Sequence, residues 1–344
     1  MTQKNFGCLG LALVIILCLS MLLNLIFIIA QSASSSAGLV TGKAPRFEEA
    51  VVVEAKEGKD VKESEGKIAL ITVRGIITSA EPGSLGESAI DDLKLQLKQA
   101  GEDEKVKAVV LHVDSPGGEV TASDIIYNAV RKVRDHHKKP VVVYMGSLAA
   151  SGGYYVACGG SWLIANETTL TGSIGVIMQT LNYEQLFGKV GLSMVTFKSG
   201  QFKDMLSGSR QMSDAEKEYV QSLIMQTYGK FVGIVAKERK LDENTLRNGL
   251  ADGRVVSGKD ALSGKLINSL GEIEDAYAKA MELAKIKNAS VIRYESPFRL
   301  GKIFRLLGQS EESRKTKVEV KIADAITPHL QAGRLYFLPS FYAP

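Results

Sequence analysis

Residues 106–118 read Val-Lys-Ala-Val-Val-Leu-His-Val-Asp-Ser-Pro-Gly-Gly, an apolar, β-rich run that stops at a turn. Such a run with little alternation favours a strand covered on both faces, which is typical of a parallel sheet. Residues 68–77 and 140–144 have the same character, and helical patterns lie between these three runs. The alternation of strand and helix predicts right-handed crossovers and an α/β domain with a largely parallel sheet.

Four helices and one more strand are expected around this core. Apolar residues recur at helical spacing over 90–100 and 126–133, and a further helical stretch covers 272–285. Ser213-Asp-Ala-Glu216 is a capping-box pattern that opens a long helix. Met194-Val-Thr-Phe197 is rich in β-forming residues and predicts a strand before the next loop.

The chain begins with a long apolar segment. Residues 6–30 are almost uncharged and exceed the roughly 20 apolar residues that cross a bilayer as a helix. They also exceed the apolar region of about 7–15 residues in a cleavable signal peptide. We expect a cytoplasmic head at 1–5, a single-pass transmembrane anchor at 6–30 and an extracytoplasmic body at the cell membrane. A cleavable leader that ends in the small residues 31–37 is the alternative.

Composition divides the remaining chain into three parts. Residues 31–66 are first rich in Ser, Ala and Gly and then charged, which is typical of a linker. Residues 67–295 hold the expected folded domain, and 296–344 form an extension with an apolar, proline-interrupted tail after Arg334. The tail is expected to pack on the body or to be disordered; the alternative is that it occupies a hydrophobic peptide groove.

Charge and cysteine content exclude two classes of protein. The formal net charge of +4 is small beside 42 basic and 38 acidic residues, and no arginine-rich tract is present. Nucleic acid is therefore not an expected partner. Of three cysteines, only Cys158 lies in the folded part, so the domain is no disulfide scaffold. Cys158 is expected to be a small buried apolar side chain.

Two glycine-containing motifs follow predicted strands, where open α/β sheets place their ligand sites. In Gly146-Ser-Leu-Ala-Ala-Ser151-Gly-Gly-Tyr-Tyr155, small residues flank Ser151 and allow a close backbone approach to a substrate. In Asp114-Ser-Pro-Gly-Gly118, the glycines can present an amide N–H to an oxyanion. Taken alone, the first motif equally fits a tight helix–sheet contact, and the second an ordinary turn.

A nucleophilic serine needs a base. Of the histidines, His112 lies inside a predicted strand, His136 and His137 lie in a lysine-rich segment, and His329 lies in the C-terminal extension. Lys203, in Lys198-Ser-Gly-Gln-Phe-Lys203-Asp204, is a second candidate. A lysine base at neutral pH needs its pKa lowered by about 3 units from about 10.4, which burial can supply. Composition alone does not separate Lys203 from a solvated surface lysine.

Taken together, the motifs resemble those of the bacterial signal peptide peptidase A family. The four ordered motifs are Ser-Pro-Gly-Gly, Ala-Ala-Ser-Gly-Gly-Tyr-Tyr, Leu-Thr-Gly-Ser-Ile-Gly and Lys-Ser-Gly-x-Phe-Lys-Asp, and the resemblance covers about 67–295. With one anchor and one catalytic repeat, the chain is similar to the short Gram-positive-type members. The resemblance implies a Clp-type, crotonase-like fold and a catalytic serine peptidase domain over 67–295.

The resemblance also assigns roles to individual residues. Ser151 matches the nucleophile and Lys203 the general base of a Ser–Lys dyad. Gly118, with the amide of Gly152, matches the oxyanion hole, and Ser173 matches the hydroxyl that orients the lysine amine. Ser147 is not the matching serine and is interpreted as structural.

The same family implies partners and substrates. Its members form dome-shaped homo-oligomers with active sites where protomers meet. The resemblance is therefore compatible with a dyad in which Ser151 and Lys203 belong to different protomers. Expected substrates are hydrophobic remnant signal peptides at the membrane, and no metal or other cofactor is needed. Two other functions fit part of the pattern: a crotonase-type acyl-CoA enzyme, which does not suit a membrane anchor, and a catalytically silent scaffold, which does not require Ser151.

Overall fold

The computed structural model describes residues 17, 19–25, 47–56, 64–79, 89–296 and 335–339. The chain forms two units, residues 1–45 and 46–344. In the first unit, residues 19–25 are helical and exposed. The predicted anchor at 6–30 lies largely outside the described residues, among which no helix is long and apolar enough to cross a membrane.

The second unit is built on a mostly parallel sheet with the order β1-β10-β2-β3-β5-β6-β9, in which β7 pairs with β5 and β8. Only the β1–β10 and β7–β8 pairs of this sheet are antiparallel. A small second sheet joins β11 to β4. The strands are β1 (Glu48–Val53), β2 (Lys67–Arg74), β3 (Val106–Ser115), β4 (Gly118–Glu119), β5 (Val141–Ala150), β6 (Trp162–Ala165), β7 (Leu170–Gly172), β8 (Val255–Ser257), β9 (Ser269–Leu270), β10 (Ser290–Glu295) and β11 (Tyr336–Phe337).

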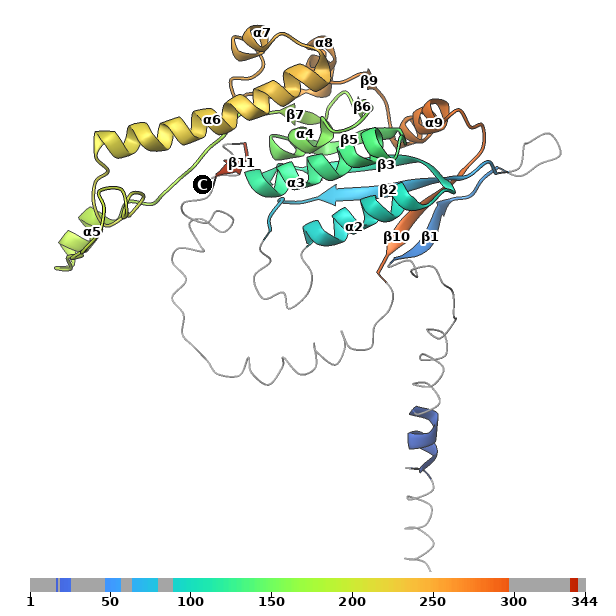
Figure 1. Cartoon of the computed structure of the whole chain (residues 1–344), viewed down its shortest axis with the longest axis horizontal. Coiled ribbons are helices and arrows are strands. Elements are labelled where there is room, and N and C mark those ends of the chain that lie inside the picture. The colour runs from blue at the N-terminus through green and yellow to red at the C-terminus, as the bar shows by residue number, and fades with distance from the viewer. Residues whose placement is uncertain are drawn as a thin grey trace, which may run out of the picture. The chain divides into compact units, whose positions relative to one another are not determined.

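Helices cover both faces of the sheet (Figure 1). They are α2 (Ala89–Glu102), α3 (Val120–Arg131) with its π-helical continuation η1 (Lys132–His136), α4 (Gly152–Ala157), α5 (Glu184–Lys189), α6 (Asp214–Arg239), α7 (Glu243–Arg247), α8 (Gly258–Ser263) and α9 (Ile273–Ala284). The larger core lies between the sheet and α2, α3, α4 and α6. The smaller core lies under α9 on the opposite face. The alternation of strands and helices predicted this mostly parallel α/β sheet, and the Clp protease-like fold is the one that the family resemblance implied.

Two expectations about local structure are wrong. Residues 48–53 fall in the predicted linker but form strand β1, because their partner β10 comes from the other end of the domain and no local pattern announces it. Residues 194–197 form no strand. They have β-forming side chains, but no strand among the described residues pairs with them, and the Phe197 side chain is 94% exposed.

Candidate active site

Ser151 lies at the turn between strand β5 and helix α4. Its backbone φ is +54°, in a region that non-glycine residues rarely adopt. The Ser151 N–H donates to the Gly172 carbonyl and the Ser151 carbonyl accepts from the Tyr155 N–H, each at 2.8 Å. The side chain is 1% exposed, and Oγ has no hydrogen-bond partner among the described residues. A strained turn that carries an unengaged hydroxyl fits a nucleophilic serine.

Gly118 and Gly152 bring two backbone amides beside this serine. A Cβ on Gly118 would lie 2.0 Å from the carbonyl oxygen of Ile77, so only glycine fits there. A Cβ on Gly152 would lie 3.0 Å from the amide nitrogen of Gly118. The turn after β3 and the turn after β5 therefore touch through their backbones, and side chains are excluded between them.

A strand of the C-terminal tail lies against the first of these turns. β11 pairs antiparallel with β4, with Phe337 opposite Gly118. The Val120 N–H donates to the Leu335 carbonyl at 3.3 Å. Because hydrogen-bonded pairs alternate along an antiparallel ladder, Gly118 and Phe337 are the next pair to exchange hydrogen bonds. The amide of Gly118 is therefore directed at a carbonyl of the tail.

The other edge of the tail strand is also held by backbone hydrogen bonds. Tyr336 and Ile177 donate to each other's carbonyls, both at 3.0 Å. Tyr336 and Leu338 are 3% and 4% exposed. The tail is thus an extended segment bound on both sides, which is how a peptide adds to a sheet edge.

Phe337, which lies opposite Gly118, places both its carbonyl and its side chain in the site. A Cβ on Gly117 would lie 2.2 Å from the Phe337 carbonyl oxygen and 2.4 Å from the Gly152 amide nitrogen, so these two groups share one small space. The Phe337 ring stacks on Tyr155 with centroids 4.9 Å apart. It also packs on Phe231 at 4.7 Å. The site therefore combines amide donors with an aromatic pocket.

Ser173 lies next to Ser151, because the β5–β7 register carries both residues to the same level of the sheet. Its N–H donates to the Arg254 carbonyl at 2.7 Å, and its side chain is buried. Four of the residues selected from the sequence, Ser151, Gly118, Gly152 and Ser173, are thus brought together. The sequence analysis did not identify Ile177 and Phe231, which contact the tail strand, and no motif marks either residue.

Lys203 lies elsewhere, in the loop between α5 and α6. Figure 1 draws α5 beyond the first turn of α6, away from the sheet. The side chains of this segment, including Leu186, Val195 and Lys203 itself, are exposed. Since the Ser151 Oγ has no hydrogen-bond partner in the part of the chain that the structure describes, no hydrogen bond joins it to Lys203. Within this single chain, the structure does not bring the two residues of the expected dyad together.

His112, the other candidate base, belongs to the opposite face of the sheet. Its neighbours Leu111 and Val113 point into the core beneath α3 and α4. The His112 ring lies 5.4 Å from that of Tyr144, which packs against the smaller core. Burial holds the pKa of His112 below its usual value. The strand thus separates this imidazole from Ser151.

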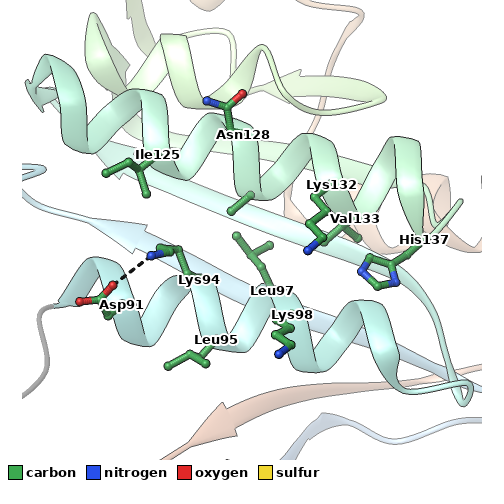
Figure 2. Close-up of a pocket in the computed structure, with 11 residues that line it drawn as sticks. Asp91, Lys94, Leu95, Leu97, Lys98, Ile125, Asn128, Lys132, Val133 and His137 are labelled. Carbon is green, nitrogen blue, oxygen red and sulfur yellow. Dashed lines mark hydrogen bonds and ion pairs between the residues drawn. The ribbon is translucent and has the colours of Figure 1, made fainter.

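A groove of about 560 Å³ between α2 and α3 lies outside the site. Figure 2 shows Leu97 and Val133 on its apolar floor, with Lys132 nearby. Lys94 reaches Asp91 across one turn of α2 at 3.1 Å. None of the candidate catalytic residues lines this groove, so its size alone does not make it the active site.

Comparisons with known proteins place the chain among peptidases. The sequence model of peptidase family S49 matches residues 134–287, and that of Clp protease matches 72–179. The chain is 37% identical over 238 residues to the "Putative signal peptide peptidase SppA" of Enterococcus faecium, and the match covers 68% of each protein.

Two longer relatives match over a smaller share of their own length. "Protease 4" of Salmonella typhi is 37% identical over 232 residues, which cover 67% of this chain and 37% of that protein. "Serine protease SPPA, chloroplastic" of Arabidopsis thaliana is 32% identical over 238 residues, which cover 67% of this chain and 35% of that protein. The two family models together match residues 72–287, which include the turns after β3 and β5.

Proposed function

Because this chain belongs to the signal peptide peptidase A family of serine peptidases, peptidase family S49, we propose that it is a membrane-anchored endopeptidase with a Ser151–Lys203 dyad. Its proposed substrates are hydrophobic peptides, among them remnant signal peptides. The observation that carries the proposal is the tail strand, because an extended segment already lies at the turns of Gly118 and Gly152, next to the residue whose hydroxyl is unengaged. The chemistry follows from the groups around that strand.

In the acylation step, the Ser151 Oγ attacks the carbonyl carbon of the scissile bond and its proton passes to the neutral amine of Lys203. The carbonyl electrons move onto oxygen, and the amides of Gly118 and Gly152 donate hydrogen bonds to the resulting oxyanion. When the C–N bond breaks, the Lys203 ammonium returns the proton to the leaving amine. An ester on Ser151 remains.

Deacylation repeats these roles with water. Lys203 removes a proton from water, the hydroxyl attacks the ester carbonyl, and the same two amides hold the second oxyanion. Collapse of this intermediate releases the carboxylic acid and returns the proton to the Ser151 oxygen. We assign the hydroxyl of Ser173, the residue next to Ser151 in the β5–β7 register, to orienting the lysine amine. The cycle balances with these side chains and water alone.

The proposed substrate class follows from the way the tail is bound. Backbone hydrogen bonds on both edges of the tail strand hold an extended chain without regard to its sequence. The pocket of Tyr155 and Phe231 adds a preference for an aromatic or large apolar side chain beside the oxyanion amides. Remnant signal peptides combine both properties, since their central regions are apolar.

The proposed base comes from a neighbouring copy of the chain. The α5 segment and its flanking loops expose several large apolar side chains, and Phe197 is 94% exposed. So many exposed large apolar side chains in one segment suggest a surface that another protein chain covers. A homo-oligomer in which this segment covers a neighbour would bury these side chains, and it would bring Lys203 to the Ser151 of that neighbour.

The membrane anchor at 6–30 remains part of the proposal on the strength of its sequence. Its apolar length suits a single span, and an extracytoplasmic body would meet signal peptides that signal peptidase has released. We accordingly propose residues 31–66 as a connection that includes strand β1, and residues 67–295 as the catalytic domain.

A serine-directed fluorophosphonate probe tests the proposed nucleophile. We expect one covalent adduct per protomer, located by peptide mass mapping at Ser151, because only an activated serine displaces fluoride from such a probe. The exposed Ser147 in the same motif provides the internal control and is expected to stay unlabelled. A folded oligomer that takes up no probe would favour a silent scaffold, and labelling only by acyl-CoA analogues would favour a crotonase-type enzyme.

Removal of residues 335–344 tests the proposed groove. The tail strand competes with added peptide at an effective concentration on the order of 1 mM, so we expect its removal to lower the KM for a hydrophobic peptide by about tenfold or more. We expect kcat to stay within about twofold, since the reacting groups are untouched. Phe337→Ala, which empties the aromatic pocket but keeps the chain, should give an intermediate KM. An unchanged KM in both variants would show that peptides bind elsewhere.

A further inference from the structure

The loop that carries Lys203 also carries a carboxylate engaged by two cations. Asp204 accepts a hydrogen bond from the Lys198 amine at 2.7 Å. It also accepts bonds from the Arg210 guanidinium, at 2.9 Å from Nε to Oδ2 and at 2.6 Å from Nη2 to Oδ1. The Asp204 side chain is 12% exposed. Both of its oxygens are therefore occupied, although it directly follows Lys203 in the chain.

Arg210 also fixes this carboxylate to helix α6. Its Nη1 and Nη2 donate to the two carboxylate oxygens of Glu216 at 2.9 and 2.5 Å. Glu216 is 2% exposed and completes a capping box with Ser213 at the start of the helix. One guanidinium thus holds two carboxylates in bidentate geometry, the arrangement for which arginine is best suited.

These contacts keep the Asp204 carboxylate charged. Hydrogen bonds from Arg210, and then from Lys198, hold the pKa of Asp204 well below its usual range. Arg210 likewise lowers the pKa of Glu216 to about 2. The other charged pair at this helix end, Asp214 with Lys217, is closed on itself at 2.9 Å. Asp204 is therefore a permanent anion next to the proposed base.

A carboxylate that pairs with a lysine stabilises its ammonium form and removes it as a base at neutral pH. We propose that Arg210 and Lys198 are positioning residues that sequester the Asp204 carboxylate, so that the amine of Lys203 stays unpaired and free to serve Ser151. This inference rests on the proposed dyad. It adds the reason that a base can lie beside an aspartate: two cations occupy both oxygens of the carboxylate, so neither oxygen is left to pair with the lysine amine.

Four variants of the full-length oligomer test the proposal by their pH–rate profiles on a hydrophobic peptide between pH 6 and 10. Arg210→Gln and Lys198→Gln each free part of the Asp204 carboxylate, and Lys198→Gln leaves the helix cap untouched. Arg210→Gln/Asp204→Asn removes the freed carboxylate as well. Arg293→Gln is the matched control, because Arg293 forms an ion pair with Glu295 at 2.7 Å on strand β10.

In Arg210→Gln, we expect the rising limb of kcat to move up by about one pH unit, since a new carboxylate partner shifts a titration by about 1–3 units. Below the limb, kcat should fall about tenfold, and it should recover at high pH where the amine is neutral. Lys198→Gln should shift the limb in the same direction. The double variant should return the limb toward its wild-type position, and Arg293→Gln should not move it.

Loss of activity at every pH without a moved limb would show that Arg210 only supports the loop, and it would overturn the proposal. A limb that stays displaced in the double variant would overturn it too, because the Asp204 carboxylate would then not be the cause. Failure of the dyad itself has a different signature: Lys203→Ala would retain full activity. Circular dichroism and native mass of each variant show whether folding or assembly has been lost, and Lys198→Gln decides the question if Arg210→Gln does not fold.

Discussion

Replacing Ser151 with alanine is expected to abolish peptide hydrolysis, with a loss in kcat on the order of 10⁶-fold, the size that follows removal of a serine nucleophile in other serine peptidases. The physical reason is specific to one atom. The Ser151 Oγ has no hydrogen-bond partner in the described part of the chain, so the hydroxyl contributes little to holding the fold. The role proposed for this hydroxyl is attack on the carbonyl carbon of the bound peptide.

The same substitution should leave stability almost unchanged. Alanine at this position adopts the φ of +54° with about the same strain as serine, because both carry a Cβ. Thermal unfolding of the Ser151→Ala variant should therefore match the wild type to within a few degrees. Ser147→Ala, an exposed change in the same motif, is the matched control and should retain activity. If Ser151→Ala hydrolyses peptide at more than about 1% of the wild-type rate, Ser151 is not the nucleophile.

The sequence predicts the fold best where the signal lies within a single strand and the turn that follows it. The buried runs that became β2, β3 and β5 were predicted because parallel strands covered on both faces are apolar throughout. The motifs of Ser151 and Gly118 attracted attention because they come after such strands, but the roles of the two residues were implied only by the family resemblance. Strand β1 was missed because its pairing with β10 joins residues more than two hundred positions apart.

The remaining errors and omissions concern contacts that no local pattern encodes. The strand predicted at 194–197 fails because β-forming side chains need a partner strand, which this segment does not find within the described chain. The tail was recognised as apolar, but its antiparallel pairing with β4 depends on geometry at Gly118. Arg210 was not identified for a similar reason. The sequence pattern predicts the capping box at Ser213, but only the three-dimensional structure shows that Arg210 links Glu216 to Asp204.

The second prediction with a large effect concerns Lys203. It tests whether Lys203 is the base and whether it acts on Ser151 of its own protomer or of a neighbour. Lys203→Ala alone is expected to reduce hydrolysis on the order of 10⁴-fold or more, since an unassisted serine hydroxyl is a weak nucleophile. If the dyad forms within one chain, a mixture of Ser151→Ala and Lys203→Ala protomers contains no complete site. If Lys203 reaches a neighbour, each interface that joins a Lys203→Ala protomer to a Ser151→Ala protomer in the right order restores one site.

Co-expression of the two inactive variants with different affinity tags, followed by sequential purification of mixed oligomers, measures this directly. Random assembly at equal ratio gives an intact Ser151 half the time and an intact neighbouring Lys203 half the time, so we expect about one quarter of wild-type activity. Mixing the variants after separate assembly, under conditions that prevent subunit exchange, should give none. Mixed oligomers without activity would place both residues of the dyad in one chain, and the α5 segment would then have to fold back onto its own β5–α4 turn, a movement that the single-chain structure does not contain.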